Sequence, residues 1–131
     1  MPCTHITQTT SKHCPKCFEV IEPLRDEIEL QRDCKMIFDQ NFKENAVLVH
    51  HQNNAETGLG GIRNKALGVR KGIPDFQVLC RKPFFIEMKF GKGVLSKDQK
   101  EMISRLESWG FKVFICRTLI EFMDTCKKNI V

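Results

Sequence analysis

Phe84-Phe85-Ile86-Glu87-Met88-Lys89-Phe90 is a run of β-forming residues that carries two charges. Side chains alternate between the two faces of a strand, so Glu87 and Lys89 share one face and Met88 points to the other. A buried charge is costly unless it is paired or bound to a cation. The run therefore predicts a buried strand with a charged pair on one face.

The segment before this run supplies a second carboxylate, in Gly72-Ile73-Pro74-Asp75. Residues 76–79 also have strand composition, and a turn follows them. A three-residue loop of residues 80–82 would set Asp75 opposite Glu87, whereas a two-residue loop would set it opposite Met88. A bulge could restore the first register. We expect the three-residue loop, which brings the two carboxylates to one face.

Two adjacent carboxylates suit a hard cation such as Mg²⁺. A lysine on the same face can orient or deprotonate the attacking water, or contact a phosphate oxygen. The alternative is a Glu87–Lys89 salt bridge at the end of an edge strand. That alternative does not explain the apolar residues on both sides of the pair, so we favour the metal site.

A helix is predicted from about residue 23 to residue 41. Its apolar stripe consists of Leu24, Leu30, Cys34, Ile37 and Phe38. Glu27 falls at the centre of this stripe and is the candidate for a third acidic group at the metal site. Glu29 falls on the opposite face, beside Arg25, Arg32 and Asp33, and is expected to be solvated.

The remaining segments alternate between strand and helix patterns. Residues 46–50 and 111–116 have strand composition. Ser96 and Gln99 form a capping box for one helix, and Thr118 with Glu121 forms another. The resulting order is helix, three strands, helix, strand, helix, which predicts a mixed α/β sheet with helices on its faces.

These motifs together resemble the VRR-NUC (virus-type replication–repair nuclease) branch of the PD-(D/E)XK nuclease superfamily. The resemblance rests on Gly72-Ile73-Pro74-Asp75, on Ile86-Glu87-Met88-Lys89, and on Gly93-Val94-Leu95-Ser96 with Gln99, and it covers roughly residues 20–126. It implies a restriction-endonuclease-like fold of order α-β-β-β-α-β-α. It also implies a Mg²⁺- or Mn²⁺-dependent DNA endonuclease that acts on branched or otherwise structured DNA and leaves a 5′-phosphate.

The resemblance also implies roles for individual residues. Asp75 and Glu87 would hold the metal, with the backbone carbonyl of Met88 and with Glu27, directly or through water. Lys89 would position or activate the attacking water. Gln99, besides capping its helix, would face the active site. Stand-alone members of this branch resemble Holliday-junction resolvases that act as homodimers, and the same is expected here.

Basic residues precede Asp75, where they could hold phosphates and steer DNA. The candidates are Arg63, Lys65, Arg70 and Lys71. The resemblance adds an Asn after the first strand, a place that Asn53 or Asn54 would fill. The alternative is a solvated loop with no DNA contact.

Residues 1–17 differ in composition from the rest and predict a small zinc-binding segment before a nuclease-like domain of residues 18–131. Cys14-Pro15-Lys16-Cys17 is a Cys-x-x-Cys knuckle. Cys3 and His5 could complete a tetrahedral structural zinc site, with His13 as the alternative fourth ligand. The competing interpretation is a frayed terminus with incidental thiols.

The composition allows this function without requiring it. The net charge is +5 and the pI about 8.9, which is compatible with a polyanionic partner. No apolar run has the length of a membrane span, no secretory leader opens the chain, and seven Cys are expected as thiols. We therefore expect a protein inside the cell, in the cytoplasm or nucleus. The alternative functions are a non-catalytic DNA-binding module and a zinc-stabilised adaptor.

Overall fold

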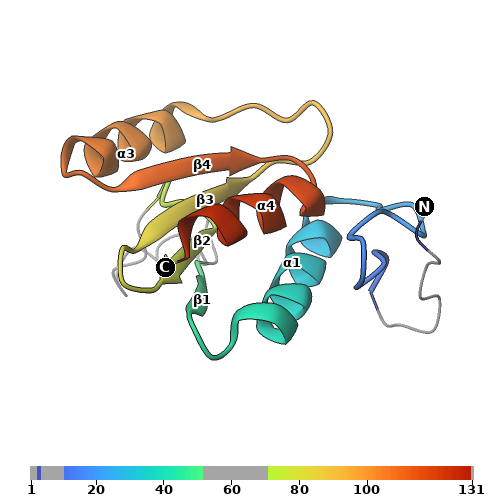
Figure 1. Ribbon diagram of the computed structural model, residues 1–131. Coiled ribbons are helices and arrows are strands. Elements are labelled where there is room, and N and C mark those ends of the chain that lie inside the picture. Colours follow the sequence, from blue (N-terminus) through green and yellow to red (C-terminus); the bar gives the residue numbers. More distant parts are fainter. Residues whose placement is uncertain (1–2, 4–10, 52–70, 131) are drawn as a thin grey trace.

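A four-stranded mixed sheet lies at the centre of the computed structural model (Figure 1), which describes residues 3, 11–51 and 71–130. The strands are β1 (Val47–His50), β2 (Phe76–Leu79), β3 (Phe84–Met88) and β4 (Lys112–Cys116), in spatial order β1-β2-β3-β4. The first two pairings are antiparallel. β3 and β4 are parallel, because a helical crossover joins them.

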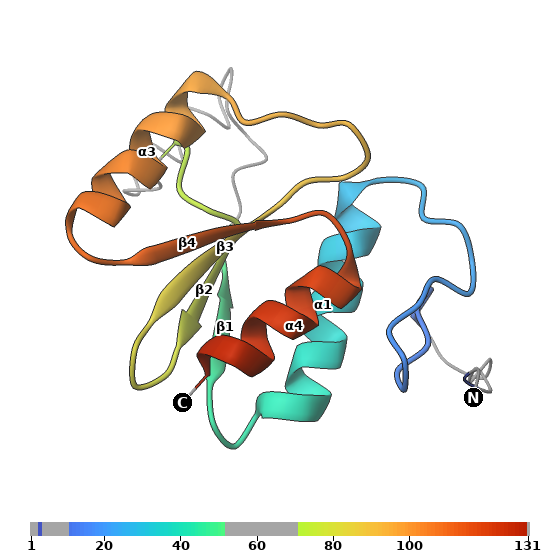
Figure 2. The ribbon, with the colours of Figure 1, turned by 45° about the horizontal axis from the view of Figure 1, so that its top comes forward.

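Within the described residues, three helices flank this sheet. They are α1 (Glu27–Phe42), α3 (Lys97–Ser108) and α4 (Leu119–Asn129). α1 and α4 contact each other on one face, and α3 lies on the other face against β4 (Figure 2). The predicted α/β class, a restriction-endonuclease-like mixed sheet flanked by helices, is confirmed. No helix among the described residues is both long and apolar enough to cross a membrane.

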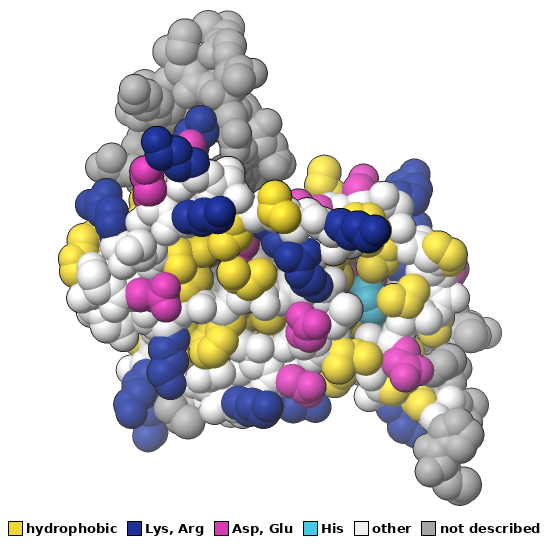
Figure 3. Space-filling view, turned by 90° about the horizontal axis from the view of Figure 1, so that it is seen from above, with side chains coloured by type: hydrophobic (Ala, Val, Ile, Leu, Met, Phe, Trp, Pro, Cys, Tyr) yellow, Lys and Arg dark blue, Asp and Glu magenta, His cyan; other side chains and the backbone are white. Residues whose placement is uncertain are grey.

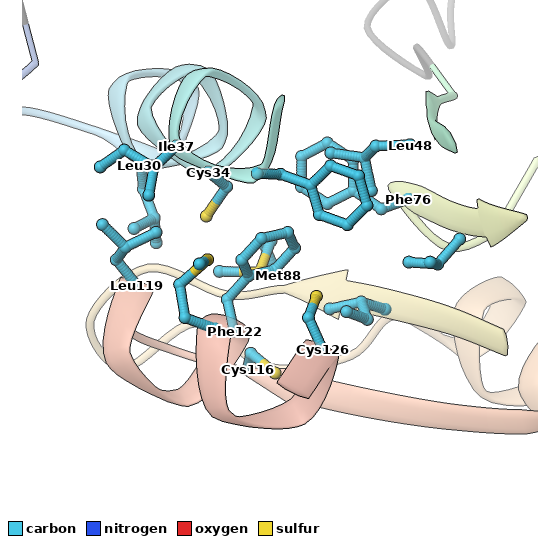
Figure 4. Packing of buried hydrophobic residues seen from close by; sticks show 14 of the residues in the cluster. Leu30, Cys34, Ile37, Leu48, Phe76, Met88, Cys116, Leu119, Phe122 and Cys126 are labelled. Atoms are coloured by element: carbon cyan, nitrogen blue, oxygen red, sulfur yellow. The ribbon is translucent and has the colours of Figure 1, made fainter. Parts of the chain in front are cut away.

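The hydrophobic core fills the space between the sheet and the α1–α4 pair (Figure 4). The stripe predicted for α1 lies in it, through Leu30, Cys34, Ile37 and Phe38. α4 adds Leu119, Phe122 and Cys126, and the strands add Phe76, Ile86 and Met88. Each large apolar side chain buried in this way contributes roughly 1.5–3 kcal/mol. This core holds in place the strands that carry the charged residues.

The predicted register of the hairpin is confirmed. Phe76 pairs with Ile86 and Val78 with Phe84, so the next position sets Asp75 opposite Glu87. The helix before the sheet begins later than predicted, at Glu27, because the Asp26 side chain accepts a hydrogen bond from the Glu29 amide at 3.0 Å. Glu27 therefore lies in the first turn of α1.

The far side of α1 is covered, which corrects one prediction. Glu29 and Asp33 are 7% and 4% exposed, although the helical pattern placed both among solvated charges. Residues 11–21 lie over them: Asp33 Oδ2 accepts from the Lys12 amide at 2.9 Å and contacts His13 Nδ1 at 2.7 Å. Hydrogen bonds from Arg25 and Lys12 hold the pKa of Glu29 down, to about 2. The periodicity of a helix does not reveal which distant segment will cover it.

Candidate active site

Two carboxyl groups meet at the end of the β2–β3 hairpin. Asp75, one residue before β2, and Glu87, within β3, are close enough to share a hydrogen bond. Asp75 Oδ2 also accepts from the Met88 amide at 2.9 Å. Glu87 is only 1% exposed, and burial together with Asp75 raises its pKa to about 10. At neutral pH the pair therefore keeps a proton unless a cation compensates its charge.

A third carboxylate reaches the same place from the first turn of α1. Glu27 is half-buried, and burial followed by the charge of Asp75 raises its pKa. Gln31, one turn further along α1, lines the same cleft and contacts His50 Nε2 through its Oε1 at 3.0 Å. The structure thus brings Glu27 together with Asp75 and Glu87, as the apolar stripe of α1 indicated.

Gln99 connects the lysine to the carboxylates. Lys89 Nζ donates to Gln99 Oε1 at 3.0 Å, and Gln99 Nε2 donates to Glu87 Oε2 at 3.4 Å. The same residue completes the capping box of α3. Gln99 Oε1 accepts from the Ser96 amide at 2.9 Å, and Ser96 Oγ accepts from the Gln99 amide at 3.2 Å. Its capping role and its place beside the carboxylates are therefore compatible, and one amide group serves both.

These groups line a single open cleft of about 370 Å³. Its lining consists of Glu27, Ile28, Gln31, Lys71, Gly72, Asp75, Glu87, Lys89, Val94, Ser96, Asp98 and Gln99. The space accommodates a hydrated cation and a phosphate group. Basic and acidic side chains alternate over the face shown in Figure 3, so the described residues form no continuous basic surface there.

Gly72 is a feature of this cleft that sequence reasoning missed. Its φ is +84°, and a Cβ at this position would lie 2.4 Å from the Asp98 carbonyl oxygen. Only glycine lets the loop before Asp75 pass so close to the first turn of α3. Gly72 therefore sets the distance between the loop that carries Asp75 and the helix that carries Gln99. The sequence signal for this close approach was the glycine that opens the Gly-Ile-Pro-Asp motif.

The donor atoms in the cleft suit a hard divalent cation. They are the carboxylate oxygens of Asp75, Glu87 and Glu27. A residue's N–H and C=O point to the same side of a strand, and the Met88 N–H points at Asp75. The Met88 carbonyl is therefore on the Asp75 side of β3 as well. An oxygen set of this kind fits Mg²⁺ or Mn²⁺, and the raised pKa of Glu87 indicates that a positive charge is needed there.

Comparison with known families agrees with this geometry. The family model of the VRR-NUC domain matches residues 19–118. The chain belongs to the VRR-NUC family. No curated protein and no solved structure matches the chain. VRR-NUC membership implies a nuclease-type hydrolase with DNA as its partner.

Of the DNA-contact residues predicted for this VRR-NUC domain, the structure describes Lys71 alone. Asn53, Arg63, Lys65 and Arg70 lie outside the described residues. Lys71 lies at the rim of the cleft, where its Nζ pairs with Asp98 Oδ2 at 3.1 Å.

Three cysteines that precede residues 19–118, the region matched by the VRR-NUC model, lie close together in the structure. The sulfur atoms of Cys3, Cys14 and Cys17 lie within 4.8 Å of one another. Desolvation and the neighbouring thiols raise the pKa of Cys3 to about 11. His13, the alternative fourth ligand, lies outside this group, because its imidazole turns toward Asp33 on α1. His5 is not among the described residues.

Proposed function

We propose that this VRR-NUC domain is a Mg²⁺- or Mn²⁺-dependent endonuclease that hydrolyses phosphodiester bonds in branched DNA. One observation carries the proposal. Carboxylates from α1, from the loop before β2 and from β3 converge with Lys89 and Gln99 in one cleft. A domain that only binds DNA has no use for three carboxylates in a phosphate-sized cleft, because they repel the phosphate unless a cation lies between.

Each residue has a distinct role in this proposal. Asp75 and Glu87 hold the cation, with the Met88 carbonyl and Glu27 beside them. The cation, when bound, polarises the phosphate and stabilises the leaving oxygen. Lys89 positions the attacking water, and one of its three ammonium protons is engaged by Gln99 Oε1. Gln99 is a positioning residue, because it fixes Lys89 and Glu87 relative to each other. Attack of the water on phosphorus breaks the bond to O3′, so the products carry a 3′-hydroxyl and a 5′-phosphate.

The substrate we propose is a four-way junction cut by a homodimer. A single cleft can cut one strand, whereas resolving a symmetric junction requires two cuts related by a two-fold axis. The net charge of +5 favours a polyanionic partner at the moderate ionic strength of the cell. None of the seven cysteines forms a disulfide, which agrees with a reducing compartment inside the cell as the place of action.

The decisive experiment compares the wild type with Lys89→Ala and with Lys92→Ala. Lys92 is an exposed lysine three residues away that does not line the cleft, and it is the matched control. The substrates are four-way, flapped and linear DNA, each in Mg²⁺ and in Mn²⁺. We expect Lys89→Ala to slow cleavage by about 10²–10⁴-fold and Lys92→Ala to leave the rate within about twofold. Equal rates for wild type and Lys89→Ala would assign the activity to a contaminant or another site.

Two further measurements separate the finer parts of the proposal. If the protein binds all three DNAs and cleaves none of them, the result would support the non-catalytic DNA-binding alternative. Gel filtration with light scattering determines the oligomeric state under cleavage conditions. A monomer that still cuts both strands of the junction would remove the dimer from the proposal while leaving the nuclease intact.

A further inference from the structure

The turn before α1 has a defined backbone geometry. The Cys14 amide donates to the Glu19 carbonyl at 2.9 Å, and the Ile21 amide donates to the Lys12 carbonyl at 2.9 Å. The Phe18 amide closes the turn by donating to the Cys14 carbonyl at 2.8 Å. Residues 12–14 thus run antiparallel to residues 19–21. Cys14 ends the first of these segments, and Cys17 lies in the turn that follows it.

Phe18 gives this turn an unusual conformation. Its φ is +67°, and among the described residues it is the one non-glycine with a positive φ. A bulky L-residue adopts this region at a cost, so a constraint outside the residue must hold it there. The Phe18 ring supplies part of that constraint, because it packs against the hydrophobic core and lies 5.0 Å from Lys127 Nζ. The second candidate for the constraint is the cluster of Cys3, Cys14 and Cys17, whose last member precedes Phe18 in the chain.

The three sulfur atoms have the spacing of a metal site. Thiolates bound tetrahedrally at about 2.3 Å from zinc lie roughly 3.8 Å apart, and the three Sγ atoms here all lie within 4.8 Å of one another. Cys14 is fully buried, and Cys3 and Cys17 are partly buried. A cluster of soft thiol ligands selects zinc over the hard cation expected in the carboxylate cleft.

We propose that Cys3, Cys14 and Cys17 bind a structural Zn²⁺ that closes the turn at residues 14–18 and holds residues 11–21 on α1. Lys12 and His13, which immediately precede the turn, contact Asp33 on that helix. The metal would thus stabilise the layer that buries Asp33 and Glu29. Zinc takes each cysteine as a thiolate, so its binding releases the thiol protons to solvent.

The first test measures zinc in the protein as purified under reducing conditions. Cys14→Ser/Cys17→Ser removes the knuckle, and Cys80→Ser is the matched control, because the Cys80 thiol lies outside the group and donates to the Lys82 carbonyl. Asp75→Asn controls for zinc in the carboxylate cleft. We expect one zinc per chain in the wild type and in both controls, and none in the double variant. Loss of zinc from Asp75→Asn alone would place the metal in the cleft and overturn the proposal.

The second test uses the wild type alone and does not depend on the folding of a variant. X-ray absorption at the zinc edge should show three sulfur ligands at about 2.3 Å. A chelator should lower the melting temperature by about 5 °C or more and speed amide exchange in residues 11–21, and Zn²⁺ but not Mg²⁺ should restore both. A shell of nitrogen and oxygen only, a Cys14–Cys17 disulfide in the isolated protein, or an unchanged melting temperature would each refute the site.

Discussion

The carboxylate cleft and the cluster of three thiols, Cys3, Cys14 and Cys17, differ in how the chain builds them. The cleft takes Glu27 from α1, Asp75 from a loop, Glu87 from β3 and Gln99 from α3. The core holds α1 and β3, and α3 packs against β4 on the other face of the sheet. Two of the three cysteines in the thiol cluster, Cys14 and Cys17, come from one short stretch of chain. A site assembled by the core exists before its metal binds, whereas a site in a short turn depends on its metal for shape. Chemistry requires the first kind of site, and a structural metal suits the second.

The largest expected effect separates catalysis from stability in the cleft. Asp75→Asn should reduce cleavage by about 10³-fold or more, because the proposed cation loses one of its carboxylate ligands. The amide oxygen can still accept the hydrogen bond from Met88, and the substitution adds no buried charge beside Glu87. We therefore expect the free energy of unfolding to change by less than about 1 kcal/mol. Single-turnover cleavage and urea denaturation measure the two quantities, and a large loss of stability would contradict a cleft formed by the core.

A pair of glycines tests how closely the cleft must be packed. Gly72→Ala and Gly110→Ala both place alanine at a positive φ, +84° and +91°, but only the first meets backbone atoms within 4 Å. Gly110→Ala should cost about 1 kcal/mol of stability, the cost of the backbone conformation alone. Gly72→Ala should cost about 3 kcal/mol and also slow cleavage, because the first turn of α3 must move. Equal destabilisation in thermal and urea unfolding would show that the contact with Asp98 is unimportant.

The attachment of residues 11–21 to α1 can be tested without changing a cysteine. Asp33→Ala leaves the Lys12 amide and the His13 ring without their shared partner, and should cost about 2 kcal/mol. Asp39→Ala is the control on the same helix, because it removes only an exposed pair with Lys35 worth about 0.5 kcal/mol. Hydrogen exchange should accelerate in residues 11–21 for the first variant alone. Unchanged exchange there would mean that Asp33 does not hold the segment.

The last prediction concerns a gradual effect, spread over several pH units, of the proton held by the carboxylate pair. Unfolded Glu87 has its ordinary pKa of 4.5, whereas the folded pKa is raised to about 10. Between these values the folded state binds more protons, so stability falls as pH rises, by at most about 1.4 kcal/mol per pH unit. Urea denaturation in buffer free of divalent cations, from pH 5 to pH 8, should show this slope. Glu87→Gln should flatten it, and Mg²⁺ should bind the wild type more tightly at higher pH.

Much of the cleft could be predicted because its signals are local. Charges within an apolar strand and the length of a turn were enough to place Asp75 opposite Glu87. The helical pattern also selected Glu27 over Glu29 as the carboxylate that faces the cleft. The buried state of Glu29 and Asp33 was not predictable, because it depends on a segment 20 residues away that pairs with them through backbone and side-chain contacts. The need for Gly72 likewise arises from a helix that begins 25 residues later in the chain.

The side-chain amide of Gln99 couples the first turn of α3 to the position of Lys89, because one oxygen accepts hydrogen bonds from both Ser96 and Lys89. When the first turn of α3 frays, Ser96 loses its partner and Lys89 loses the oxygen that holds its ammonium group. Local melting of one turn would therefore silence cleavage while the sheet and core stay intact. A ligand or DNA strand that clamps this turn would have the opposite effect, so substrate docking and activation would occur in a single event.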